Sequence, residues 1–132
     1  MSKSRRNAIA LRATEDETVQ LIRRATTDSE RTITYEPERR PEVSNLVLLA
    51  ALCQGRVPEA VAAEIGDGGA AALKRVLTES VNDRLRPIRA RRAELLRDPG
   101  HLREVLHAGN GRARVRAEAT LAEVRRLMHT VY

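Results

Sequence analysis

The stretch AAALKRVLTESVNDRLRPIRARRAELLR, residues 70–97, is the longest periodic segment of the chain. Its apolar residues recur every three or four positions, as they do on one face of an α-helix. Pro87 lies inside the pattern and the periodicity resumes after it, so we expect one long helix with a kink at the proline. The apolar positions of this face are Leu73, Val76, Leu77, Val81, Leu85, Ile88 and Leu95.

Two segments before this helix carry helix signals of their own. Thr14 is followed three residues later by Glu17, the spacing of a capping box, and predicts a helix over 15–25. Residues 31–35 alternate weakly and are compatible with an extended segment, and the prolines at 37 and 41 predict irregular chain. Ser44 is a good N-cap for an almost wholly apolar helix over 45–54, which Gly55 ends.

The remaining signals for helix starts and ends complete an all-α prediction. A short helix is expected over 57–65, followed by a hinge at residues 67–69. Asp98 before Pro99 predicts the start of a fifth helix, which Gly109 closes, and a sixth helix follows over 111–130. The expected fold class is therefore all-α, a bundle of about six helices with an irregular N-terminal loop segment and one long proline-kinked helix.

Composition places the chain among basic single domains. It has 132 residues, of which 42% are hydrophobic, with 24 Lys plus Arg against 18 Asp plus Glu and a net charge of +6. That charge is compatible with nucleic acid as a partner, while the abundance of Arg and Ala is equally explained by a GC-rich genome. No apolar run approaches the ~18 residues of a membrane span. The single cysteine, Cys53, fits a reducing cytoplasm.

Metal and nucleophile chemistry are not supported by the spacing of the reactive residues. His101, His107, His129 and Cys53 show no ligand spacing, so we expect no metal site. Glycines at 66, 68 and 69 follow a predicted helix and are not accompanied by Gly-Lys-Ser/Thr, so they do not predict a phosphate cradle.

Two clusters of arginine are candidates for binding RNA phosphates. One straddles Pro87, and the other opens the predicted last helix, where free backbone N–H groups would add to the attraction for an anion. The alternative is a solvated face whose charge is balanced by Glu79, Asp83, Glu94 and Glu118. The candidate residues are Arg84, Arg86, Arg89, Arg91 and Arg92 in the first cluster, and Arg112, Arg114 and Arg116 in the second.

The N-terminal tetrapeptide Met1-Ser2-Lys3-Ser4 is the sharpest chemical signal. A lysine between two hydroxyl groups suits a polyphosphate, because the ammonium group meets the charge that develops on a leaving pyrophosphate.

These features occur together with several further sequence blocks. They are IRRATTDS at 22–29, PEVSNL at 41–46, LRPIRARR at 85–92 and HAG at 107–109. In this order and at these distances the blocks closely resemble the C-terminal part of bacterial tryptophanyl-tRNA synthetases, starting at the Lys-Met-Ser-Lys-Ser loop. The likeness extends over essentially the whole chain.

The resemblance implies roles for particular residues. Ser2, Lys3 and Ser4 would bind ATP phosphates, and Lys3 would be catalytic if the rest of the catalytic domain is supplied. Residues 1–41 would be a remnant of the catalytic-domain ATP loop with its linking helix, and residues 42–132 a helical anticodon-binding-like domain. The family also implies a cytoplasmic homodimer whose partner is tRNA with the tryptophan anticodon, and ATP with Mg as the cofactor of the complete enzyme.

The departures from the family pattern shape the expected function. The first lysine of the loop motif, the His-Ile-Gly-His-like ATP signature and the tryptophan pocket do not occur in these residues, and a start at the loop methionine suggests truncation. We therefore expect a truncated or split synthetase module that binds tRNA without activating tryptophan and holds no cofactor alone. The alternatives are an interaction protein that docks on an intact synthetase, or a nonfunctional gene fragment. Residues 1–41 are expected to be loosely held, with an apolar patch exposed near the first two helices.

Overall fold

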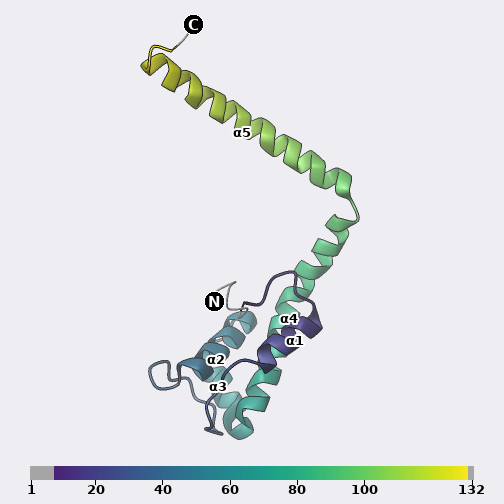
Figure 1. Cartoon of the computed structure of the whole chain (residues 1–132). Coiled ribbons are helices and arrows are strands. Elements are labelled where there is room, and N and C mark those ends of the chain that lie inside the picture. Colours follow the sequence, from purple (N-terminus) through teal and green to yellow (C-terminus); the bar gives the residue numbers. More distant parts are fainter. Residues whose placement is uncertain (1–7, 131–132) are drawn as a thin grey trace. The chain divides into compact units, whose positions relative to one another are not determined.

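The computed structural model describes residues 8–130 as helices joined by irregular segments (Figure 1). No β-strand occurs within this range, so the predicted all-α class is confirmed. The helices are α1 (Glu15–Arg23), α2 (Pro41–Gln54), α3 (Pro58–Ile65), the short 3₁₀ helix η1 (Gly66–Gly68), α4 (Gly69–Leu96) and α5 (Pro99–Leu127).

Contacts divide the chain into two units, and the boundary falls between Ala90 and Arg91. We call the described part of the first, residues 8–90, the N-terminal unit, and the described part of the second, residues 91–130, the C-terminal unit. Every buried side chain of residues 8–130 belongs to the N-terminal unit. α4 crosses this boundary. Its first 22 residues belong to the N-terminal unit, which contains the core, and its last six belong to the C-terminal unit.

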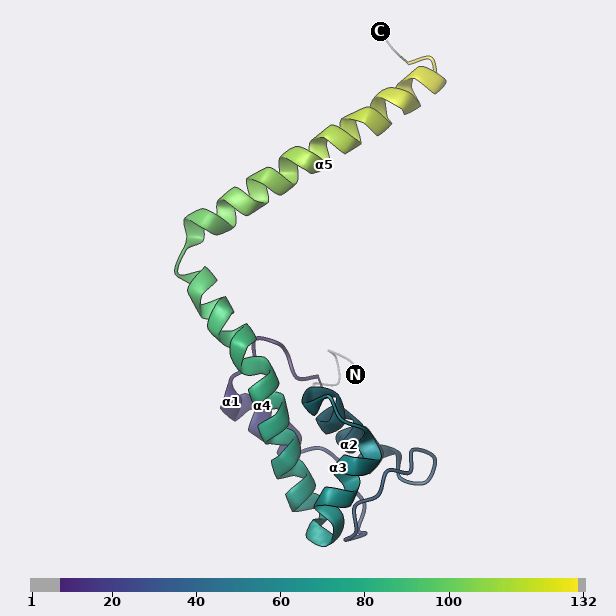
Figure 2. The ribbon, with the colours of Figure 1, turned by 180° about the vertical axis from the view of Figure 1, so that it is seen from behind.

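The core of the N-terminal unit forms between α2, α3 and α4, which lie side by side in Figure 2. α2 contributes Val43, Val47 and Ala50, and α4 contributes Leu73 and Leu77, all of them at most 1% exposed. Burying one such leucine stabilises a fold by about 1.5–3 kcal/mol, so these positions dominate the stability of the unit. Among the described residues no single helix is long and apolar enough to cross a membrane, although the bent pair Pro41–Gln54 and Pro58–Leu96 meets that test jointly.

The predicted capping box at the start of α1 is confirmed. The Thr14 hydroxyl accepts from the Glu17 N–H at 3.1 Å, and the Glu17 carboxylate accepts from the Thr14 N–H at 2.8 Å. α1 also lies along α4 (Figure 1), where Lys74 Nζ donates to the carbonyls of Arg23 and Ala25 at 3.1 and 2.7 Å. A lysine of α4 therefore caps the C-terminal carbonyls that α1 cannot satisfy by itself.

α2 begins earlier than predicted. It starts at Pro41, the first helical position, and Arg40 is the N-cap, so the expectation that Ser44 caps this helix was wrong. Proline is well suited to the first position because its φ is already helical and the N–H that it lacks would have no partner there. Ser44 is buried instead, and its hydroxyl accepts from the Glu36 N–H at 2.9 Å.

Where a hinge was predicted at residues 67–69, the structure has the short 3₁₀ helix η1 followed directly by α4. Gly66 and Gly69 adopt φ values of +50° and +75°, which a side chain would strain, and between them η1 leads directly into α4. The Gly66 carbonyl accepts from the Ile33 N–H at 2.8 Å, which ties this turn to the irregular segment at residues 31–35.

The last two predicted helices are one. Gly109 and Gly111 lie inside α5, so the described chain has five α-helices and η1 in place of six separate helices. Each glycine costs a helix interior about 1 kcal/mol relative to alanine, but alanines, arginines and leucines on both sides favour continuation. Pro87 likewise lies inside α4, which continues to Leu96 as expected.

The segment before α2 is integrated into the core. Thr18, Ile22, Ile33 and Arg40 are all at most 3% exposed, which differs from the expectation that this part of the chain is loosely held. The functional boundary between residues 41 and 42 remains a prediction, since the structural division lies at a different place.

Candidate nucleic-acid interface

The arginines around Pro87 have different surroundings in the structure. Arg84, Arg86, Arg91 and Arg92 are exposed, whereas the side chain of Arg89 is only 17% exposed. The sequence presents these five as one cluster, so their separation into exposed and internal groups comes from packing.

Arg89 uses its guanidinium group inside the protein. Its Nε donates to the Ala13 carbonyl at 2.8 Å and its Nη2 donates to the Thr18 hydroxyl at 2.9 Å. Its Nη1 donates to Asn82 Oδ1 at 3.0 Å. Together with Lys74, Arg89 therefore holds both ends of α1 against α4, and these contacts leave it poorly placed to bind phosphate.

Two of the exposed arginines on α4 have acidic neighbours on the same helix. Arg86 pairs with Asp83 at 2.7 Å, and Arg91 pairs with Glu94 at 2.8 Å. Exposed pairs of this kind are worth little in stability and can exchange partners readily. Arg84 and Arg92 have no ion pair or side-chain hydrogen bond to any residue of the range 8–130.

The second arginine cluster lies in the middle of α5. Arg112, Arg114 and Arg116 follow the helix start at Pro99 by more than three turns. Their backbone N–H groups are therefore inside the helix, and the prediction that free N–H groups assist phosphate binding there was wrong. Arg114 approaches Glu118 at 3.8 Å, while the other two have no acidic partner in the described chain.

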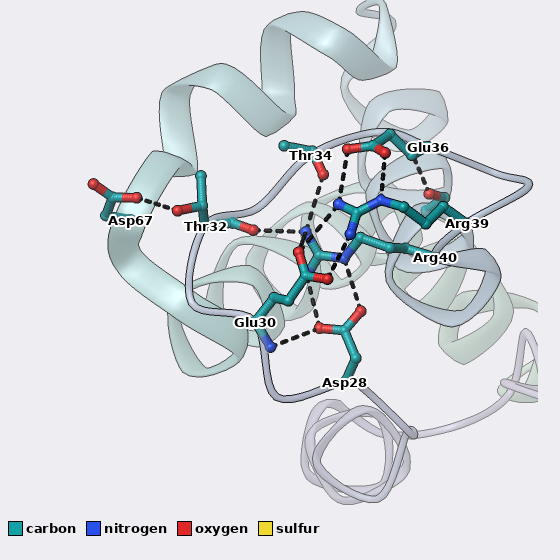
Figure 3. A network of polar contacts seen from close by, with 9 residues as sticks. Asp28, Glu30, Thr32, Thr34, Glu36, Arg39, Arg40 and Asp67 are labelled. Carbon is teal, nitrogen blue, oxygen red and sulfur yellow. Dashed lines mark hydrogen bonds and ion pairs between the residues drawn. The ribbon is translucent and has the colours of Figure 1, made fainter.

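A polar network between α1 and α2 was missed by the sequence analysis (Figure 3). Arg40 donates to both carboxylate oxygens of Asp28, at 2.8 and 2.7 Å, and to the Thr32 carbonyl at 2.6 Å. Arg39 binds Glu30 and Glu36 in the same forked manner. Because Arg40 is buried and every donor named here has an acceptor, this network shapes the loop and leaves no guanidinium for a ligand.

The pKa values of the network also indicate that its groups are charged and paired. The hydrogen bond from Arg39 lowers the pKa of Glu36 from 4.5 to about 2. The hydrogen bond from Arg40 lowers the pKa of Asp28, and Asp28 in return raises the pKa of Arg40. All four groups are thus charged at neutral pH, as a structural network of ion pairs requires.

The other predicted site residues do not form a catalytic or metal-binding arrangement in the part of the chain that the structure describes. Ser2, Lys3 and Ser4 lie outside the described residues. Over residues 8–130 no three His, Cys, Asp or Glu side chains gather in a way that could hold a metal ion. Cys53 is half-buried, and burial raises the pKa of its thiol. Among the predicted site residues that the structure describes, the exposed arginines are therefore the remaining candidates for binding.

Comparison with known proteins identifies the family of this helical chain. Residues 1–86 match the family described as tRNA synthetases class I (W and Y). The chain belongs to this family. It is 38% identical over 104 residues to the tryptophan–tRNA ligase of Synechocystis sp., a match that covers 79% of this chain and 31% of the relative. It is 42% identical over 93 residues to tryptophan–tRNA ligase 1 of Streptomyces avermitilis, covering 70% and 28%.

The similarity reaches beyond the N-terminal unit. The tryptophan–tRNA ligase of Wolinella succinogenes is 35% identical over 128 residues, covering 95% of this chain and 39% of the relative. Since this match leaves out only a twentieth of the chain, it extends into α5. The chain spans about a third of the length of these relatives.

Proposed function

We propose that this chain is the tRNA-binding helical part of a tryptophan–tRNA ligase and that these 132 residues alone do not activate tryptophan. The family and its tryptophan–tRNA ligase relatives support the first half of the proposal. The observation that carries it is that four arginines of the two predicted clusters are exposed and have no acidic partner among residues 8–130. They are Arg84, Arg92, Arg112 and Arg116.

Unpaired arginines are suited to RNA because the guanidinium fork binds two phosphate oxygens at once. Four such contacts would release about four counterions, so the affinity should fall by roughly 3–4 log units for each log unit of salt. The paired residues Arg86, Arg91 and Arg114 would contribute less, because a phosphate has to displace a carboxylate from each of them.

The absence of activation follows from what the reaction requires. Tryptophan, the ATP α-phosphate and the hydrogen-bond donors must be held together, and a loop lysine cannot supply that positioning alone. We propose that Ser2, Lys3 and Ser4 bind ATP only when this chain works with the remaining two-thirds of a ligase. Pyrophosphate exchange by the isolated chain in the presence of tryptophan would contradict this.

The test is binding of tRNA with the tryptophan anticodon, measured by filter binding over a salt series. We expect tighter binding of this tRNA than of an unrelated tRNA, and a salt slope that falls by about three or more when the four unpaired arginines are changed to glutamine. The matched control changes four arginines outside the two clusters, Arg12, Arg23, Arg24 and Arg75. They are also exposed and without an acidic partner among residues 8–130, so the control removes the same charge and differs only in position.

Two results would overturn the proposal. Equal binding of all tRNAs would remove the specificity, and an equal loss in both quadruple variants would show that only the net charge matters. Circular dichroism of each variant establishes that the helices are retained.

A second function, docking on an intact synthetase, is favoured by apolar side chains of the N-terminal unit. Leu11, Leu52 and Val57 are each more than 60% exposed. Co-purification with a full-length tryptophan–tRNA ligase, lost on changing these three residues to serine and unaffected by ribonuclease, would support docking over RNA binding.

A further inference from the structure

Arg89 connects α4 to the segment that leads into α1. Its guanidinium group donates to the Ala13 carbonyl at 2.8 Å, to the Thr14 carbonyl at 3.4 Å and to the Thr18 hydroxyl at 2.9 Å. These acceptors lie 71 to 76 positions before Arg89 in the sequence. One side chain of α4 therefore holds both the residues just before α1 and the first turn of α1.

The segment before α1, residues 8–14, depends on Arg89 for its polar contacts with the rest of the unit. The Ala13 N–H donates to the Ala10 carbonyl at 2.8 Å, which closes a turn, and Ile9 packs against the core. Within residues 8–130, every hydrogen bond to this segment from an element other than α1 is donated by Arg89. The path of the segment is therefore set by one guanidinium group and by apolar packing.

An arginine is needed for this set of contacts. Arg89 Nη1 also donates to Asn82 Oδ1 at 3.0 Å, so a residue about two turns earlier on α4 orients the guanidinium group. The planar guanidinium has five N–H donors in fixed directions, whereas the single nitrogen of a lysine cannot reach all of these acceptors at once. The Arg89 side chain is 17% exposed, so water competes little for its donors.

We propose that Arg89 is a positioning residue for Ser2, Lys3 and Ser4, the residues proposed above to bind ATP. Ser4 is five positions before Ile9 in the sequence, so the place where residues 8–14 lie limits where Lys3 can act. Arg89 acts through the backbone of the segment and does not touch ATP. The inference rests on the proposed function and names the residue on which the placement of these groups depends.

The proposal predicts which kinetic constant changes. The Lys3 ammonium group is suited to the charge that develops on a leaving pyrophosphate, so its displacement should slow activation more than it weakens tryptophan binding. A misplacement of about 1 Å caused by a residue outside the reacting groups can lower a rate about a hundredfold.

Lys74 provides a matched control at the other end of α1. It is also a cation of α4, and its Nζ donates to the carbonyls of Arg23 and Ala25. In the described chain it makes no hydrogen bond to residues 8–14. Lys74→Met should therefore weaken the hold of α4 on α1 without displacing the segment, so it separates a loss of α1 stability from a change in position.

The first measurement is amide hydrogen exchange of the 132-residue chain. We expect the Ala13 amide to exchange about tenfold or more faster in Arg89→Gln and to change about twofold or less in Lys74→Met. Exchange in the Leu77 region should stay the same in both variants and show that the core is retained.

The second measurement is pyrophosphate exchange by a chimera in which this chain replaces the part of the Wolinella succinogenes tryptophan–tRNA ligase that it matches. We expect kcat to fall about ten- to a hundredfold in Arg89→Gln, with the KM for tryptophan within about twofold. Arg89→Lys should restore little of the rate, and Lys74→Met should change kcat about twofold or less. Asn82→Ala, which leaves the Arg89 contacts to α1 in place, should lower kcat by a smaller factor.

The possible results separate this inference from the proposed function. Equal losses of kcat in Arg89→Gln and Lys74→Met, or full activity of Arg89→Lys, would reduce Arg89 to a structural role and overturn the inference alone. If Arg89→Gln unfolds α1, unchanged kcat in Asn82→Ala overturns it instead. An inactive chimera with the unaltered chain would contradict the proposed ATP-binding role, and this inference with it.

Discussion

The N-terminal and C-terminal units have similar secondary structure and different burial. Residues 8–90 bury side chains from α1, α2, α3 and α4, whereas residues 91–130 bury none. Both α4 and α5 are long helices rich in arginine and alanine with apolar residues at helical spacing. The comparison shows that an amphipathic pattern predicts a helix and does not by itself predict burial.

α1 is held by tertiary contacts with α4. α1 has only nine residues, and α4 binds both of its ends through Lys74 and Arg89. A helix this short is marginal alone, so these tertiary contacts support it. At the start of α5 the Asp98 carboxylate accepts from the His101 N–H at 2.9 Å, and Asp98 directly precedes the helix in sequence.

The largest expected difference between the units comes from matched leucine substitutions. Leu77→Ala should lower the free energy of unfolding by about 3–5 kcal/mol, because it leaves a cavity in the core. Leu106→Ala, at an exposed position of α5, should change it by about 0.5 kcal/mol or less. Urea unfolding followed by circular dichroism measures both, and equal costs would mean that Leu106 is buried like Leu77 in the free chain.

A smaller loss is expected from the buried arginine of the polar network. Arg40→Ala removes the partner of Asp28 and of the Thr32 carbonyl and should cost about 3 kcal/mol in the N-terminal unit. Arg40→Lys should recover little of this, since an ammonium group cannot make the forked contact. Arg39→Ala, in the exposed half of the network, is the control and should cost less; the same urea series decides the order.

The network also predicts a pH dependence confined to the N-terminal unit. The pKa of Glu36 is lowered in the folded state from 4.5 to about 2, so its contribution to stability is fully present above pH 4.5 and is lost as the pH falls toward 2. Glu36→Gln should flatten the decline of the urea midpoint over this window. Glu38→Gln, at a neighbouring exposed position, should leave the decline as it is.

The smallest effect is expected in the C-terminal unit. Gly109→Ala and Gly111→Ala should each stabilise α5 by about 0.8–1 kcal/mol, because both glycines are helical and nothing surrounds the added methyl group. Slower amide hydrogen exchange at residues 105–115 would show this. No change in exchange there would contradict a continuous helix, and the Leu77 region should exchange as before.

Sequence reasoning was successful where the determinants are close in the chain. The capping box of Thr14 and Glu17, the Asp98 N-cap and the helix through Pro87 were all predicted, since each depends on residues within a few positions of one another. The family was also predicted, and the comparisons confirm it. The loop residues Ser2, Lys3 and Ser4 and the tRNA-binding arginines remain predictions.

Local competition explains the wrong boundaries. Two glycines suggested a break in α5, but the helix formers around them outweighed a cost of about 1 kcal/mol each. Ser44 resembled an N-cap, yet Pro41 starts the helix and the hydroxyl binds Glu36. Sequence alone gave no means to rank these competing local signals.

The sequence by itself determined the all-α class and the family, because helical periodicity, capping and motif order depend on residues that are close together in the chain. Only the tertiary structure decided which arginines are internal. Arg89 meets Ala13 across 76 positions of sequence, and Arg40 meets Asp28 across twelve. An arginine that binds a carbonyl and one that faces water have the same local sequence signature, and only the packing of distant segments separates them.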